Sequence, residues 1–254
     1  MGKGVISKSL AAIRKEPHET SEMVNQMLFG ETFDIVEDYK GWLRIIGHID
    51  QYHGWLDSRL TNAIEGESLS ENYKLATSLF KAQECDCKFH VNLCPGSVLR
   101  EFNNGNFICG KAIFQQIDDP FADVKENKSE TIAHIAKTYV NSPYLWGGRS
   151  PYGIDCSGLV QVVYRIAGIN LPRDASQQAE TGSTVDFIDH VELGDLAFFD
   201  NAEGSITHVG IIMDKTHIAH SSGYVRIDKF DHQGIFDAKT NQYTHKLRVI
   251  KRVI

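Results

Sequence analysis

A cysteine, Cys156, opens an apolar segment directly after an aspartate, Asp155. Apolar residues then recur at the spacing of one helix face: Leu159, Val160, Val163, Ile166 and Ala167. Asp155 is a residue type that caps helix N-termini, so Cys156 is expected in the first turn. The positive end of the helix dipole favours a thiolate there, and a thiolate is a nucleophile. A small buried core residue is the alternative, as for most lone cysteines.

Two histidines follow in strand-like runs, His208 in THVGIIM and His220 in HIAHSSG. A thiolate nucleophile needs a general base, and that base needs a third group that fixes its tautomer. A helix carrying Cys156, packed on a sheet with the two histidines on adjacent strands, would supply all three groups. Satisfied structural histidines are the alternative.

Four segments together resemble the NlpC/P60 family of cysteine peptidases, in order and in spacing. They read PYLWGGRSPYGIDCSGLVQVVYRIAGINLPRDASQQAETG, LGDLAFF, THVGIIM and HIAHSSG. The resemblance covers residues 120–254. It implies a papain-like α+β domain that hydrolyses amide bonds of peptidoglycan peptides.

The resemblance assigns roles to individual residues. It implies that Cys156 is the nucleophile, His208 the general base and His220 the residue that orients the base. Tyr144, in the YLWGG run, matches a tyrosine that lies beside the nucleophile and helps the oxyanion site. The backbone N–H of Cys156 is the second expected oxyanion donor.

Three further positions match substrate-binding residues of the family. Asp155 and Ser157 flank the nucleophile and are expected to face the bound peptide. The run PRDASQQ resembles the segment whose aspartate, here Asp174, pairs with the free amine of the substrate. Ala175 stands where a hydroxyl residue is common, so one hydrogen bond to the amine is expected to be missing or replaced.

The N-terminal region alternates short apolar runs with turn signals, which is typical of a small β-barrel. Its segments AIRKEP, SEMVNQMLFGETFDIVEDYKGWLRI and DQYHGWLDSRLT resemble a bacterial SH3 domain. Such domains bind cell-wall peptide or brace a catalytic domain. Trp42 and Trp55 are expected in the barrel core.

We also expect this barrel to close the amine end of the catalytic cleft. Tyr52, just before the Gly-Trp of the closing strand, is the expected wall, because its ring can block a channel. Glu31 is the candidate second carboxylate for the substrate amine. A surface-loop position for Tyr52 and a purely structural role for Glu31 are the alternatives.

The predicted fold class is α+β, a papain-like NlpC/P60 domain preceded by one or two small SH3-like β-barrels. The predicted domains are 1–62, a bacterial SH3-like domain, 63–118, a second and degenerate one, and 119–254, the catalytic domain. A charged stretch, residues 118–128, is the expected linker, and residues 129–139 have the spacing of a helix that starts the catalytic domain.

The middle region, residues 63–118, is the least distinctive. An NNGN turn between two apolar runs predicts a hairpin over residues 98–109. Residues 72–82 fit either a pair of strands or a helix.

Composition limits the function classes. An apolar fraction of 42% and a charged fraction of 23% are those of an ordinary globular protein. The net charge of −7 argues against nucleic acid as a partner, because phosphate binding needs a basic face. Short apolar runs argue against a membrane span, and the N-terminus lacks the apolar region of a signal peptide. We therefore expect a cytoplasmic protein, with a periplasmic or cell-surface location as the alternative if a signal was removed.

The five cysteines are expected to be reduced thiols. Cys85 and Cys87, with Cys94 and Cys109, raise the alternative of a zinc site, which their spacing supports poorly. No metal and no cofactor are expected.

The expected function is that of a cysteine endopeptidase. The resemblance implies hydrolysis of the γ-D-glutamyl-L-diamino acid bond of stem peptides with a free N-terminal L-Ala, as in murein peptide recycling. An exported hydrolase of intact peptidoglycan, a papain-like amidase or acyltransferase on another substrate, and a non-catalytic wall-binding protein are the alternatives. The diamino acid and the oligomeric state stay open.

Overall fold

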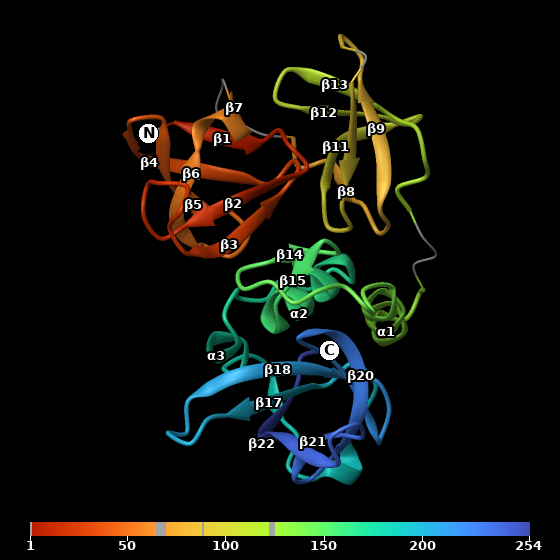
Figure 1. Ribbon diagram of the computed structural model, residues 1–254. Helices are drawn as coiled ribbons and strands as arrows, with labels where there is room; N and C mark the ends of the chain where they lie inside the picture. The colour runs from red at the N-terminus through yellow and green to blue at the C-terminus, as the bar shows by residue number, and fades with distance from the viewer. Residues whose placement is uncertain (1, 65–69, 88, 122–124) are drawn as a thin grey trace. The chain divides into compact units, whose positions relative to one another are not determined.

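The computed structural model describes residues 2–64, 70–87, 89–121 and 125–254. They form two compact units, Met1–Asp123 and Val124–Ile254 (Figure 1). The boundary falls within the predicted linker, whose residues 122–124 lie outside the described part. Strands dominate, with three α-helices among the described residues, and the predicted α+β class is confirmed. None of these helices has the length and apolar character needed to cross a membrane.

The first unit begins with a seven-stranded antiparallel sheet in the order β3-β2-β6-β5-β4-β1-β7. The strands are β1 (Lys3–Ile6), β2 (Leu10–Arg14), β3 (Met23–Leu28), β4 (Thr32–Tyr39), β5 (Trp42–Gly47), β6 (His53–Asp57) and β7 (Thr61–Ile64). Leu43 and Leu56 face each other in register and lie in the core. Because side chains alternate along a strand, the neighbouring Trp42 and Trp55 point away and are only half-buried. The prediction that these tryptophans fill the core is therefore wrong.

A second antiparallel sheet of six strands follows, in the order β10-β9-β13-β12-β11-β8. The strands are β8 (Tyr73–Leu75), β9 (Phe80–Glu84), β10 (His90–Leu93), β11 (Val98–Asn103), β12 (Asn106–Cys109) and β13 (Ala112–Gln116). The predicted hairpin over residues 98–109 is present, and its turn uses the positive φ angles of Asn104 and Gly105. Residues 72–82 form strands, although β8 and β9 pair with other strands and not with each other. That this sheet is a second SH3-like domain stays a prediction.

The turn between β3 and β4 joins the two sheets. Phe29 leaves the first sheet and packs its ring edge-on against Phe107 and Phe114 of the second, with ring centroids 5.9 and 5.1 Å apart. The next residue, Gly30, has φ +78°, and a Cβ there would lie 2.1 Å from the carbonyl oxygen of Val98. Only glycine fits this close approach.

The second unit contains the helices α1 (Lys128–Thr138), α2 (Cys156–Ile166) and α3 (Ala175–Gln178). Its large sheet has the order β16-β22-β17-β18-β19-β20-β21, and β22 pairs again with β21. Six strands therefore close into a barrel, with β16 at its side. The strands are β16 (Ser183–Thr184), β17 (Leu196–Asp200), β18 (Ile206–Ile212), β19 (His217–Ser222), β20 (Tyr224–Asp231), β21 (Gly234–Asp237) and β22 (Gln242–Arg252). A short hairpin, β14 (Arg149–Ser150) and β15 (Gly153–Ile154), precedes α2.

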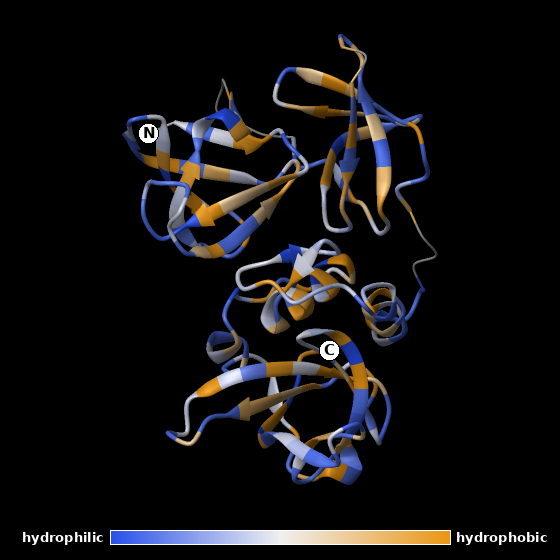
Figure 2. Cartoon of the chain, in the orientation of Figure 1, coloured by the Kyte–Doolittle hydropathy of each residue, from blue (hydrophilic) through white to orange (hydrophobic). Residues whose placement is uncertain are grey.

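Helix α2 packs against β18 and β19 and is covered on all sides from Cys156 to Arg165. Figure 2 shows hydrophobic residues on both α2 and β18. The sequence predicts one apolar face, but Gln161 and Arg165 are buried as well. The helix is therefore central to the unit, and its first turn is enclosed by protein.

Candidate active site

Asp155 caps helix α2, as predicted. Its Oδ1 accepts a hydrogen bond from the backbone N–H of Gly158 at 2.7 Å. Its Oδ2 accepts one from the backbone N–H of Gly147, in the preceding loop, at 2.8 Å. The carboxylate therefore starts the helix and fixes the loop beside the nucleophile.

Arg173 forms a buried ion pair with this cap. Its Nη1 and Nη2 lie 3.0 and 2.5 Å from the two carboxylate oxygens of Asp155, and both side chains are almost wholly buried. Nη1 also donates to the hydroxyl of Ser157 at 2.8 Å, and that hydroxyl lies 3.3 Å from Asp155 Oδ1. The polar atoms of Asp155 and Ser157 thus contact the protein itself. That the two residues face bound peptide stays a prediction.

Glycines allow the loop to pass close to the helix. A Cβ on Gly158, in the first turn of α2, would lie 2.3 Å from the carbonyl oxygen of Gly148. A Cβ on Gly148 would lie 2.3 Å from the carbonyl oxygen of Gly153. The nucleophile therefore sits at a point where three backbone segments touch.

Cys156 is buried at the start of α2, and the backbone N–H of Val209 hydrogen-bonds to its thiol. Val209 follows His208 on β18, so this contact brings Cys156 to the strand that carries the predicted general base. Burial raises the pKa of the thiol from 9.0 to about 12, and Asp155 adds to the rise. The backbone N–H of Val209 and the guanidinium of Arg173 oppose this rise. Burial therefore opposes the expected thiolate in the resting site.

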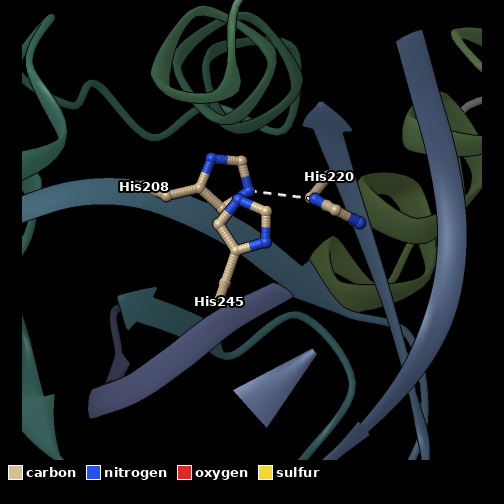
Figure 3. A group of neighbouring side chains, drawn as sticks. All are labelled: His208, His220 and His245. Carbon is tan, nitrogen blue, oxygen red and sulfur yellow. Dashed lines mark hydrogen bonds between the residues drawn. The ribbon is translucent and has the colours of Figure 1, made fainter. Parts of the chain in front are cut away.

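The two predicted histidines are hydrogen-bonded to each other. β18 and β19 are adjacent antiparallel strands, and His208 Nε2 lies 2.9 Å from His220 Nδ1 (Figure 3). Burial lowers the pKa of His208 well below 6.5, and His245 and His220 add to this shift. His208 is therefore neutral near pH 7 and can accept a proton.

Asp228, on β20, is hydrogen-bonded to the second of these histidines. Its Oδ2 lies 3.0 Å from His220 Nε2. Burial raises the pKa of Asp228, but hydrogen bonds from His220 and Arg226 outweigh burial, and the net shift is downward. Arg226 bridges Asp228, at 2.6 Å, and Asp237, at 3.1 Å. Asp228 is thus an ionised acceptor behind His220.

His245 on β22 stacks against the ring of His208, with centroids 4.1 Å apart and an interplanar angle of 26° (Figure 3). The closed barrel brings it there, since β22 pairs with both β17 and β21. Burial, and then His220 and Arg226, lower the pKa of His245 to about 4.

Three imidazoles at this spacing could hold a metal ion, since one ring nitrogen from each of His208, His220 and His245 lies within 4.8 Å of the others. Two nitrogens bound to one tetrahedral zinc are about 3.3 Å apart, given bonds of about 2.0 Å. The 2.9 Å between His208 and His220 fits a hydrogen bond better. Among the described residues, no cysteine joins such a group.

Tyr144 lies near the nucleophile. Its backbone N–H donates to the carbonyl of Gly223, just after β19, at 3.0 Å. Burial raises the pKa of its hydroxyl to about 12, and the proximity of Cys156 and Asp155 adds to the rise. Its part in an oxyanion site stays a prediction.

Asp174 directly follows the buried Arg173 and precedes α3. It is half-buried, and its side chain does not cap that helix. Adjacent Cα atoms are about 3.8 Å apart, so the backbone of Asp174 lies close to the Arg173–Asp155 pair. Its pairing with a substrate amine stays a prediction.

Tyr52 and Glu31 belong to the first unit. Tyr52 immediately precedes β6, is half-buried, and its backbone N–H donates to Asp50 Oδ1 at 3.1 Å. Glu31 is buried, and its Oε2 accepts the backbone N–H of Leu28 at 3.1 Å. That bond gives Glu31 a structural role in the turn that joins the two sheets. Their expected roles toward substrate stay predictions.

The arrangement can perform acyl transfer from a neutral pair. In the predicted roles, His208 would take the thiol proton of Cys156 as the sulfur attacks a carbonyl carbon. The resulting imidazolium then gives that proton to the leaving amine, and His208 activates water to release the acyl group. His220 holds the ring of His208 throughout.

Sequence reasoning missed Arg173, Asp228 and His245. Arg173 lies next to Asp174 in the PRDASQQ run, so the sequence motif already contained it. Asp228 lies two residues after Arg226 in the run YVRIDKFD, so both side chains are expected on one face of a strand. That pattern does not predict His220 as the partner of Asp228. No sequence pattern pointed to His245, because its contact with His208 depends on the closure of the barrel.

Comparisons with known proteins identify the two kinds of domain in this chain. The profile of the NlpC/P60 family matches residues 141–246, and that of the bacterial dipeptidyl-peptidase SH3 domain matches residues 13–59. The γ-D-glutamyl-L-lysine dipeptidyl-peptidase of Bacillus cereus is 26% identical over 79% of this chain and 68% of its own length. The protein of the same name from Bacillus subtilis is 28% identical over 77% and 71%.

A crystal structure of an NlpC/P60 family protein from Bacillus cereus has the same fold. It superposes with a TM-score of 0.82 over 99% of both chains, at 18% identity. The NlpC/P60 match spans Cys156, His208 and His220, and the chain therefore carries an NlpC/P60 cysteine peptidase domain, with a bacterial SH3 domain ahead of it.

Proposed function

We propose that this peptidase hydrolyses the γ-D-glutamyl-L-diamino acid bond of peptidoglycan stem peptides that carry a free N-terminal L-Ala, as in murein peptide recycling. The observation that carries the proposal is that Cys156 is hydrogen-bonded by the backbone of Val209, the residue after His208, while His208 is hydrogen-bonded to His220. Two relatives named γ-D-glutamyl-L-lysine dipeptidyl-peptidases support this bond as the substrate.

The free amine is the second part of the proposal. Asp174 lies next to the residue that binds the helix cap, and a carboxylate there would pair with the ammonium of L-Ala. In an N-acylated peptide that nitrogen carries no charge, so Asp174, once covered by the bound peptide, would lack its cation, at a cost of about 3–5 kcal/mol. This corresponds to at least about a hundredfold preference for the free amine.

The test compares L-Ala-γ-D-Glu-L-Lys with its N-acetylated form, with products identified by mass spectrometry. We expect cleavage between D-Glu and L-Lys, and little cleavage of the acetylated peptide. Cys156→Ala should abolish cleavage without changing the circular dichroism spectrum. Equal rates on the two peptides would contradict the role of the free amine.

A matched pair of variants separates Asp174 from a general charge effect. Asp174→Asn should lose most of the preference for the free amine, whereas Asp186→Asn, an exposed aspartate of the same unit, should keep it. If both variants keep the preference, Asp174 is not the amine partner. If neither peptide is cut at the γ-glutamyl bond, the proposed bond is wrong.

A further inference from the structure

The candidate active site continues beyond its second histidine into the barrel. His220 is 1% exposed in its side chain, and its Nε2 lies 3.0 Å from Oδ2 of Asp228. Asp228 is also mostly covered, with 13% of its side chain exposed. Three strands, β18, β19 and β20, thus place His208, His220 and Asp228 in one hydrogen-bonded series.

The chemistry of the three groups fixes where each proton is. An ionised carboxylate only accepts hydrogen bonds, so Nε2 of His220 must carry the proton. In a neutral imidazole the other nitrogen is then an acceptor, so Nδ1 of His220 accepts from Nε2 of His208. This leaves the lone pair of His208 on Nδ1, and Figure 3 shows that nitrogen on the side of the ring away from His220.

We propose that Asp228 is a positioning residue that acts through His220 and holds His208 in the tautomer whose Nδ1 takes the proton of Cys156. No bond is made or broken at Asp228 itself. Its part is to exclude the opposite tautomer, in which Nδ1 of His208 carries a proton and cannot act as the base.

The charges around Asp228 favour this orienting role over one in which the charge of Asp228 acts directly on His220. Arg226, on the same strand, donates to both oxygens of Asp228 and to Asp237 on β21. The guanidinium offsets much of the carboxylate charge, so Asp228 acts on His220 mainly through the hydrogen bond that it accepts. His245 on β22 faces both histidines and is neutral above about pH 4.

The competing interpretation is that Asp228 serves only as a partner of Arg226 and that His220 would keep its tautomer without it. A purely structural pair would change stability when broken, but it would not change which nitrogen of His208 carries the proton. Tautomer state is therefore the decisive measurement.

The first experiment uses the unmodified protein. ¹⁵N-labelled histidine spectra at pH 7 should show both His208 and His220 neutral and protonated on Nε2. Assignment uses His208→Gln and His220→Gln. Protonation of His208 on Nδ1, or an imidazolium at His220, would overturn the proposal.

The second experiment replaces the carboxylate. In Asp228→Asn the side chain loses its charge and one of its two acceptor atoms becomes an N–H₂ donor, so the acceptor that holds Nε2–H of His220 is weakened or lost. We expect kcat to fall about 10- to 100-fold with KM nearly unchanged. This is less than the roughly 10⁴-fold loss seen when an aspartate in direct contact with a catalytic base is replaced, because His220 intervenes.

The chain offers a matched control at the start of β19. Asp214, in the turn before β19, lies 3.0 Å from Nδ1 of His217, the first residue of that strand, and both side chains are exposed. Asp214→Asn makes the same chemical change and should leave kcat and the His208 spectrum unchanged. Equal effects of the two variants, or an Asp228→Asn protein with unchanged kcat and tautomer, would contradict the proposal.

Because the kcat assay rests on the proposed substrate, a third readout is independent of it. The rate of Cys156 alkylation by iodoacetamide at pH 7, followed by mass spectrometry of the Cys156 peptide, should fall at least about tenfold in Asp228→Asn. If the unmodified enzyme cuts no γ-glutamyl peptide but the alkylation and tautomer results hold, the proposed function fails and the role of Asp228 stands. If Asp228→Asn does not fold, the spectra of the unmodified protein decide alone.

Discussion

Arg173 binds both carboxylate oxygens of Asp155, at 3.0 and 2.5 Å, directly beside the nucleophile. Asp155 also caps α2 and holds the backbone N–H of Gly147. One buried ion pair thus fixes the loop before Cys156 and the first turn of the helix that carries it.

Breaking this pair should weaken both folding and catalysis. Arg173→Met leaves a buried carboxylate without its cation, and we expect the free energy of unfolding to fall by about 3–5 kcal/mol. The measurement is urea unfolding at pH 7. Arg59→Met is the control, because Arg59 makes a similar paired contact with Asp57 at the surface, where such a pair is worth about 0–1 kcal/mol. Equal losses in the two variants would contradict a special role for the buried pair.

Gly158 should tolerate no side chain. In Gly158→Ala the new Cβ would lie 2.3 Å from the carbonyl oxygen of Gly148, so the loop or the helix start must shift. We expect kcat/KM to fall at least about 100-fold, because small displacements of a nucleophile cost this much. Glu130→Ala, at the same position of α1 and exposed, should leave activity unchanged. Activity close to that of the parent in Gly158→Ala would show that the contact is easily relieved.

The resting state of Cys156 can be tested by its reactivity. Burial raises the pKa of this thiol to about 12, so the alkylation rate of Cys156 in the absence of substrate should be low at pH 7 and rise continuously up to pH 10. The measurement is mass spectrometry of the Cys156 peptide after timed iodoacetamide treatment. A rate that is already maximal at pH 7 would mean that the resting site holds a thiolate.

His245 should make stability depend on pH. Its pKa in the folded protein is lowered to about 4, so the fold favours the neutral ring. This contribution to stability is complete above pH 6.5 and is lost as the pH falls from 6.5 toward 4. We expect the Tm of His245→Gln to fall less between pH 7 and pH 4.5 than the Tm of the parent. His18→Gln, an exposed histidine between β2 and β3, should fall as the parent does, and identical slopes for all three proteins would refute the role of His245.

The sequence by itself determined the local structure around the nucleophile. The Asp155 cap, the start of a helix at Cys156 and the strands that carry His208 and His220 follow from short-range capping chemistry and from apolar spacing. These features depend on residues close together in the chain, and the structure has each of them.

Tertiary structure decided the remaining partners and the charge state of the site. His245 meets His208 only because β22 closes the barrel against β21, and Asp228 meets His220 only because β20 pairs with β19. The pKa of Cys156 shows the same dependence on tertiary structure. A helix dipole stabilises a nearby charge by about 0.3–1 kcal/mol, or about 2 kcal/mol when partly buried. A rise in the pKa from 9.0 to about 12 corresponds to on the order of 4 kcal/mol, so burial outweighs the dipole. Burial depends on which surfaces pack against α2, and no local pattern in the chain specifies that.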